Sequence, residues 1–262
     1  MTLLDYFADH EIEEEKQLSV KRDSNLKEEL YFATYSFKNK ARIWKLDYYG
    51  AKPFHVASRP DIVRTLCGHK DYVYDAGDYC SIFNTLKDRK GENALATRSN
   101  WIHALCSHDD CLYDGGAYNG IFDTLNDRDG ENSLAIRFDW IRILCSHEGS
   151  MYDAGNYCQV FETLDDRNGE NALATRSNWI RILCSHAGSL YDAGNYCKIL
   201  DTVNHRSGGP PVATRPGWVY ALCSHRGRLL DGGCFGNIYD TLEDSIVFEC
   251  DEHVTAMCSH KG

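Results

Sequence analysis

The chain has 262 residues, of which 43% are hydrophobic, enough to build the core of one large domain or two small ones. Its 28 basic and 39 acidic residues give a formal net charge of −11, so its electrostatic field opposes binding to nucleic acid and anionic membranes. Because it has no run of 18 apolar residues and its N-terminus lacks the features of a secretory signal, we expect a soluble, cytoplasmic protein.

Residues 1–28 differ in composition from the rest of the chain. They are acidic, contain lysines and carry no strand pattern, so we expect an N-terminal extension, either a peripheral helix or an extended segment. Three β-rich segments follow, at Glu29–Tyr35, Ala41–Leu46 and Pro53–Arg59. The folded domain is expected to span residues 29–262.

The remainder of the chain is internally repeated. The tetrapeptide Leu-Cys-Ser-His, with glycine for serine in its first copy, ends at histidines spaced 39 residues apart: His69, His108, His147, His186 and His225. A sixth copy, Met-Cys-Ser-His, ends 35 residues later at His260. This regularity indicates duplication of one structural unit, and most repeated residues should therefore serve the unit rather than a unique site.

Each repeat contains four strand-like segments separated by turns. Within residues 140–176 they are Trp140–His147, Ser150–Gly155, Gln159–Leu164 and Ala172–Arg176. Turn pairs such as Glu148-Gly149 suit tight hairpins, and no 3.6-residue apolar period is visible. Four strands in 39 residues predict an antiparallel meander, the unit that forms one blade of a β-propeller.

The two ends of the chain carry incomplete units that complement each other. The segment His253–His260 is a first strand only, whereas residues 29–59 supply strands two to four. We therefore predict an all-β, six-bladed β-propeller of four-stranded antiparallel blades. The C-terminal strand should pair with the N-terminal blade strands, which leaves no open sheet edge between first and last blades. The alternative is seven blades, which requires further strands from residues 1–28.

The four-stranded unit, the aspartate after its second strand and the closure at the termini resemble the WD-repeat and related β-propeller superfamily. The resemblance covers about residues 29–262. The third strand ends in Glu-Thr-Leu or Asp-Thr-Leu where WD repeats have Trp-Asp, and the histidine lies at the first hairpin. The resemblance implies a rigid disc that serves mostly as a docking platform and only sometimes as an enzyme scaffold.

The repeated cysteines and histidines are residue types that bind zinc, but here they are spread one pair per blade around the ring. Equivalent cysteines of neighbouring blades should also lie too far apart for disulfides. We therefore expect no metal site, no cofactor and no disulfide framework. Each histidine should form a hydrogen bond across its own hairpin.

Charged residues recur ten positions before and six positions after the repeat histidines. The arginines are Arg59, Arg98, Arg137, Arg176 and Arg215, and the aspartates are Asp75, Asp114, Asp153, Asp192 and Asp231. Both sets should lie on one rim, because strand one begins where strand two ends. They can form salt bridges within or between blades, or the arginines can ring the central channel and bind a phosphate, a carboxylate or an acidic peptide.

The same rim carries four tryptophans, each seven positions before a repeat histidine: Trp101, Trp140, Trp179 and Trp218. Such side chains can pack between blades or anchor a partner at the surface. If several of them are exposed, this face is the interaction surface.

A unique site should lie where the repeat symmetry breaks. In the last unit Cys250 stands at the arginine position, His253 stands at the tryptophan position, and Asp251 lies between them. These three are the catalytic candidates, because a thiol and an imidazole can form a nucleophilic pair. The alternative is drift in a blade assembled from both termini. His103 is another singular residue, at a position occupied elsewhere by Arg64, Arg142, Arg181, Tyr220 or Thr255.

The sequence favours a non-enzymatic platform that binds a protein or peptide partner on one propeller face through the rim arginines and tryptophans. The alternative is a small-molecule or anion-binding propeller, or a hydrolase, with its site at the channel mouth near the last blade. A small anionic ligand remains an option, whereas nucleic acid and membranes are not expected as partners.

Overall fold

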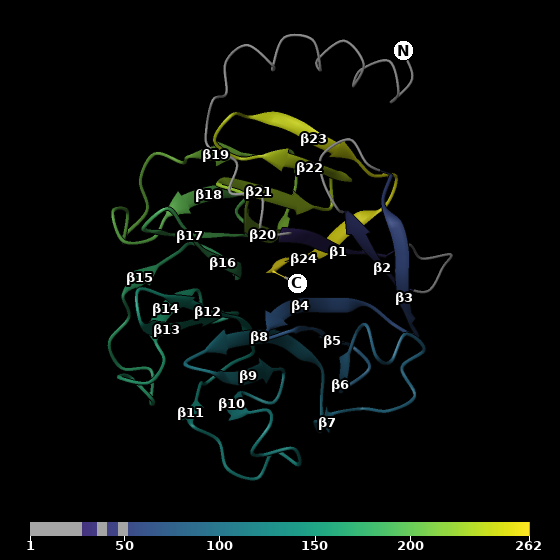
Figure 1. Cartoon of the computed structure of the whole chain (residues 1–262). Coiled ribbons are helices and arrows are strands. Elements are labelled where there is room, and N and C mark those ends of the chain that lie inside the picture. The colour runs from purple at the N-terminus through teal and green to yellow at the C-terminus, as the bar shows by residue number, and fades with distance from the viewer. Residues whose placement is uncertain (1–27, 36–40, 47–51, 262) are drawn as a thin grey trace.

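The computed structural model describes residues 28–35, 41–46 and 52–261. Their strands form six four-stranded antiparallel sheets, which surround a central axis as blades (Figure 1). The prediction of a six-bladed propeller is confirmed, and the seven-bladed alternative is wrong because six sheets already close the ring. The predicted extension lies outside the described residues except for Glu28, which begins the first strand.

Innermost and second strands form the longest hairpins of each blade. The innermost strands are β4 (Val63–His69), β8 (Ile102–His108), β12 (Ile141–His147), β16 (Ile180–His186), β20 (Val219–His225) and β24 (His253–Lys261). The second strands are β5 (Tyr72–Gly77), β9 (Cys111–Gly116), β13 (Ser150–Gly155), β17 (Ser189–Gly194), β21 (Arg228–Gly233) and β1 (Glu28–Tyr35).

The outer strands are shorter. The third strands are β6 (Ser81–Asn84), β10 (Gly120–Asp123), β14 (Gln159–Glu162), β18 (Lys198–Asp201), β22 (Asn237–Asp240) and β2 (Ala41–Leu46). The outermost strands are β7 (Ala96–Thr97), β11 (Ala135–Ile136), β15 (Ala174–Thr175), β19 (Ala213–Thr214), β23 (Ser245–Glu249) and β3 (Phe54–Arg59). We number the blades 1 to 5 from β4–β7 to β20–β23, and we call the sheet β24-β1-β2-β3 the closing blade.

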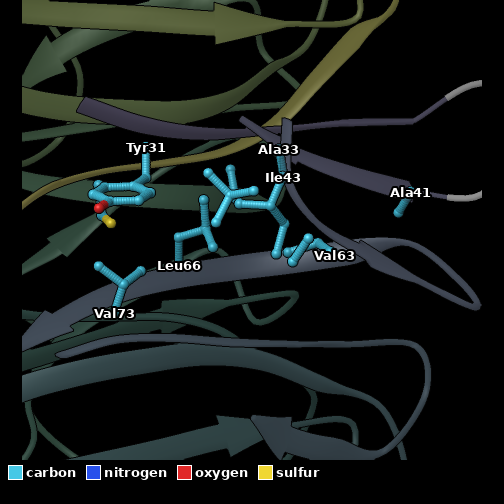
Figure 2. Packing of buried hydrophobic residues seen from close by; sticks show 11 residues of the cluster. Tyr31, Ala33, Ala41, Ile43, Val63, Leu66 and Val73 are labelled. Carbon is cyan, nitrogen blue, oxygen red and sulfur yellow. The ribbon is translucent and has the colours of Figure 1, made fainter. Parts of the chain in front are cut away.

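The closing blade joins the two ends of the chain as predicted. Strand β24 pairs antiparallel with β1, with Phe32 opposite Met257 and Tyr31 opposite Cys258. Apolar side chains of the closing blade pack against blade 1. Tyr31 and Ile43 of the closing blade lie beside Val63 and Leu66 of blade 1 in one buried cluster (Figure 2). Because this contact buries apolar surface from both ends of the chain, it stabilises the closed ring.

A ring of hydrogen bonds links neighbouring innermost hairpins. The Nδ1 atom of His108 lies 2.9 Å from the Oγ atom of Ser146 in the next blade, and the same contact joins five successive blade pairs. The expectation of a bond across the histidine's own hairpin is therefore wrong for these five imidazoles, which reach the serine of the following blade. The sixth, His260, faces Gly68 of blade 1, which has no hydroxyl to offer. All twelve cysteines are free.

The two faces of the disc are defined by the direction of the innermost strands. We call the face where these strands begin the tryptophan face, because a tryptophan directly precedes the first residue of four of them: Trp101, Trp140, Trp179 and Trp218. The histidine face is the opposite one, where the strands end. Among the described residues, no helix has the length and apolar character needed to cross a membrane.

Candidate functional site at the channel mouth

The arginines and aspartates of the repeat meet in pairs between blades. Arg137 follows strand β11 of blade 2 and donates from Nε and Nη2 to Asp153 of blade 3, at 2.7 and 2.5 Å. Tyr157 and Thr163 donate their hydroxyls to the same carboxylate. Equivalent bidentate pairs join Arg59 to Asp75, Arg98 to Asp114, Arg176 to Asp192 and Arg215 to Asp231.

These arginines are enclosed rather than presented to a ligand. Arg137 is only 2% exposed, and its Nη1 atom donates to the carbonyls of Ile136 and Arg167. Four of its five N–H groups are therefore bound inside the protein. The salt-bridge interpretation thus accounts for these five repeated arginines. The alternative, in which they surround the channel and bind an anion, has no support.

The sixth blade interface lacks this network. Phe32 and Cys250 occupy the aspartate and arginine positions, and the ring of Phe32 lies 5.7 Å from that of Phe248. A cavity of about 280 Å³ lies beside them and is bordered by Trp44. This interface shows that two blades can pack through apolar contacts in place of the ion pair.

The catalytic candidates of the last unit do not form a reactive pair. Burial, together with the charges of Asp251 and Glu252, raises the pKa of Cys250 to about 12, so its thiol stays protonated near neutral pH. His253 is exposed at the start of β24. In the described part of the chain no hydrogen bond joins Cys250, Asp251 or His253 to one another. We assign them no catalytic role.

A different set of residues faces the channel, and a backbone irregularity places it there. In β12, Ile141 pairs with Gly155 and Ile143 pairs with Ala154, which leaves Arg142 as the extra residue of a β-bulge. Such bulges re-aim side chains and recur next to active sites. Every innermost strand has one, and the residues at these positions are Arg64, His103, Arg142, Arg181, Tyr220 and Thr255.

The six bulge residues border one cavity at the mouth of the channel. It has a volume of about 40 Å³ at its outer end. A further cavity of about 130 Å³ separates five of them from a ring of apolar side chains: Leu66, Leu105, Leu144, Leu183, Leu222 and Met257. These apolar residues are buried. The space suits one small group and is smaller than the pockets that hold drug-sized ligands, which are about 300–1,000 Å³.

The arginines at the mouth differ in how their charges are neutralised. Arg64 donates from Nε and Nη2 to the carboxylate of Asp78, at 2.8 and 2.7 Å. Arg142 and Arg181 instead donate from Nε to the amide oxygens of Asn156 and Asn195. Neither forms an ion pair with a carboxylate of the described residues. Burial and the neighbouring Arg181 and Arg64 lower the pKa of Arg142 to about 10.

The tryptophans surround these arginines. Arg142 lies over the rings of Trp140 and Trp179, at 4.9 and 5.6 Å from their centroids. Arg181 lies over Trp179 and Trp218, at 5.8 and 5.3 Å. Trp101, Trp179 and Trp218 are nevertheless 39%, 39% and 45% exposed. The tryptophans therefore pack against the site and also present apolar surface to solvent.

His103 is the buried member of the site. It is 3% exposed and stacks on Trp140, and its Nε2 atom lies 3.3 Å from Nη1 of Arg142. No described residue forms a hydrogen bond with its Nδ1 atom. Burial and the charges of Arg142, Arg64 and Arg181 lower its pKa from 6.5 to about 2. The imidazole is therefore neutral at any physiological pH.

Acid should destabilise the wild type more steeply than the variant His103→Thr, which copies Thr255. Between pH 6.5 and about 2 the unfolded chain binds a proton at this histidine and the folded chain does not, so stability falls as pH falls. Each unit below 6.5 costs up to about 1.4 kcal/mol. Urea unfolding of both proteins between about pH 7 and pH 5 measures the difference, and parallel pH profiles would contradict it.

In the sequence, the bulge position stands out only because its residue differs between units, with His103 in one of them. The available signal was a polar or charged residue between apolar neighbours in five of the six units, such as Arg142 between Ile141 and Ile143; in blade 1, Arg64 is followed by the polar Thr65. In a regular strand this pattern indicates only a side chain on the other face.

Comparisons with known proteins bear on the fold. No protein-family model matches the chain. No curated protein matches it in sequence either. Among solved structures, the crystal structure of the WD40 β-propeller domain of Doa1 matches with a TM-score of 0.56 and 12% identity, over 86% of this chain and 80% of that one. At this identity the match shows the fold alone, a WD40-like β-propeller.

Proposed function

We propose that this protein is a non-enzymatic interaction platform and that a protein or peptide partner docks on its tryptophan face. The observation that carries the proposal is the set of three half-exposed tryptophans around the channel mouth, Trp101, Trp179 and Trp218. Tryptophan is the side chain most enriched among residues that dominate binding energy. Stacking on Arg142 and Arg181 restrains Trp179 and Trp218 before binding, which lowers the entropic cost of docking.

The closed channel favours a surface-docked partner over an enclosed substrate. The ring of buried leucines and Met257 lies directly below the mouth, and the space above it holds only a small group. The proposal places binding on the tryptophans and not on Arg59, Arg98, Arg137, Arg176 and Arg215, whose donors are occupied inside the protein. The cytoplasmic location stays a prediction.

Loss of the exposed indoles should abolish partner binding. We expect proteins recovered by the immobilised full chain from a lysate of its own cells to be absent with the triple variant Trp101→Ala, Trp179→Ala, Trp218→Ala. With a purified partner, each tryptophan that anchors it should weaken binding about 30-fold, the equivalent of about 2 kcal/mol.

The control for this experiment is Leu242→Ala, which removes a 50% exposed apolar side chain beyond strand β22. Strand β22 runs toward the histidine face, so this variant alters the opposite side of the disc. It should recover the wild-type set of partners. Recovery of that same set by the correctly folded triple variant would refute docking on the tryptophan face.

A further inference from the structure

We infer that the partner carries a phosphoryl group and that the channel mouth binds this group between Arg142 and Arg181. The inference about the partner rests on the proposed docking face. The anion site itself can be tested without any partner, because it depends only on the bulge residues at the mouth.

The first argument is the uncompensated charge of the site. Two half-buried guanidinium groups lie together without a carboxylate partner among the described residues, in a protein whose net charge is −11. Like charges so placed repel each other, and an anion between them would remove the repulsion. All five arginines at the other repeated position are paired with aspartates.

The repeats of the chain show that a neutralising residue fits this position. Nine positions after the repeat histidine, blade 1 has Asp78, which pairs with its bulge arginine Arg64. Blades 3 and 4 have Asn156 and Asn195 there, which bind their arginines through neutral amides. The two blades therefore orient their arginines in the same way as blade 1 but leave the positive charge in place.

The second argument is the set of free donors at the mouth. The tryptophan rings lie over the faces of both guanidinium groups. The guanidinium Nε atoms are bound to Asn156 and Asn195, and Nη1 of Arg142 contacts His103, which leaves Nη2 of Arg142 and both Nη atoms of Arg181 for a ligand. No described residue accepts a hydrogen bond from the Nη atoms of Arg181. The side chains of Tyr220 and Thr255 border the same cavity, and buried His103 has a nitrogen atom without a partner among the described residues.

Charge and size select the anion. A phosphoryl group carries about −1.5 to −2 charges near pH 7 and three acceptor oxygens, which matches two unpaired guanidinium groups. A carboxylate would neutralise only one of them. Arg142 and Arg181 border both cavities at the mouth, of about 40 and 130 Å³, which together leave space for one such group. The exposed tryptophans around the mouth can contact the residues that flank a phosphorylated side chain.

Calorimetric titration of the full chain with inorganic phosphate at constant ionic strength tests the site. We expect saturable binding of one phosphate, weakened at least about tenfold in Arg142→Gln or Arg181→Gln and lost in the double variant. The matched control is Arg128→Gln, which makes the same charge change on an exposed outer loop and should bind like wild type. Absence of saturable binding, or unchanged binding by the double variant, would overturn the inference.

A stability measurement separates loss of the site from damage to the fold. Without phosphate, Arg142→Gln should unfold at a temperature equal to or above that of wild type, because it relieves repulsion. Added phosphate should raise the melting temperature of wild type and of Arg128→Gln but not of the double variant. Equal phosphate-induced shifts in all three proteins would overturn the site.

Peptides distinguish a partner-borne phosphoryl group from free phosphate. An array of peptides with phosphorylated serine, threonine or tyrosine, each beside its unphosphorylated counterpart, should be bound in the phosphorylated form by wild type and not by the double arginine variant. Phosphate binding without preference for any phosphopeptide would overturn the assignment to a partner. Phosphate binding together with an unchanged partner set in the tryptophan variant would refute the docking face alone.

Discussion

Replacing Asp153 with alanine is expected to lower the free energy of unfolding by about 3–5 kcal/mol, the usual cost of orphaning a buried charge. Asp153 is fully buried and accepts hydrogen bonds from Arg137, Tyr157 and Thr163. Its removal leaves the guanidinium between blades 2 and 3 without a counter-charge and two hydroxyls without their acceptor. Urea unfolding at neutral pH measures the loss.

Asp165→Ala is the matched control, because it removes an exposed carboxylate from the same blade. It should change stability by less than about 0.5 kcal/mol. Asp153→Asn tests whether charge or shape matters more, since it keeps the side-chain volume but cannot neutralise Arg137. A loss for Asp153→Ala as small as that for Asp165→Ala would show that the network does not hold the blades together.

The interface between blade 5 and the closing blade shows why the stability loss expected for Asp153→Ala comes from the unpaired charge of Arg137 and not from the absence of an ion pair as such. There the network is replaced as a whole by Phe32, Phe248 and Cys250, and the blades still pack. Replacing a buried ion pair by apolar residues is often neutral, whereas removing one partner is not. The irregular residues of the last unit are therefore explained by packing between blades. Packing does not explain Arg142 and Arg181, whose charges have no carboxylate partner among the described residues.

Sequence periodicity was sufficient to predict the architecture. The spacing of 39 residues, the four strand-like segments per unit and the complementary ends led to six blades and to pairing of β24 with β1. Periodicity also placed Arg137 and Asp153 on one rim. It could not decide between a salt bridge and a ligand site, because that choice depends on contacts between blades that the repeat does not encode.

The channel-mouth site could not be predicted from the sequence, because it depends on a local irregularity of the backbone. A β-bulge adds one residue to a strand without changing its composition, so the segment Ile141-Arg142-Ile143 has the same pattern whether Arg142 faces the channel or a neighbouring blade. The exposure of Trp101 and Trp218 was equally open, because an aromatic residue at a rim fits both packing and docking.

The glycine that ends the second strand in blades 1 to 5 gives the other large expected effect. A Cβ atom built on Gly116 would lie 2.1 Å from the carbonyl oxygen of Trp101 and 2.8 Å from the ring of Tyr118. The carbonyl cannot turn away freely, because it accepts the backbone N–H of Ala117 at 2.9 Å. Gly116→Ala is therefore expected to cost about 3 kcal/mol or more in the free energy of unfolding.

The neighbouring glycine in the same strand provides the control. A Cβ atom on Gly115 would lie 3.0 Å from the Cγ2 atom of Ile141, and its next neighbours lie at 3.4 Å or more. Other blades have alanine at this position, as at Ala76 and Ala154. Gly115→Ala should therefore change stability by less than about 1 kcal/mol. Because Gly116 lies opposite Ile102 at the start of the bulge, its substitution disturbs the backbone that aims His103 into the channel. Equal effects of the two substitutions in urea unfolding would show that this close approach does not fix the bulge.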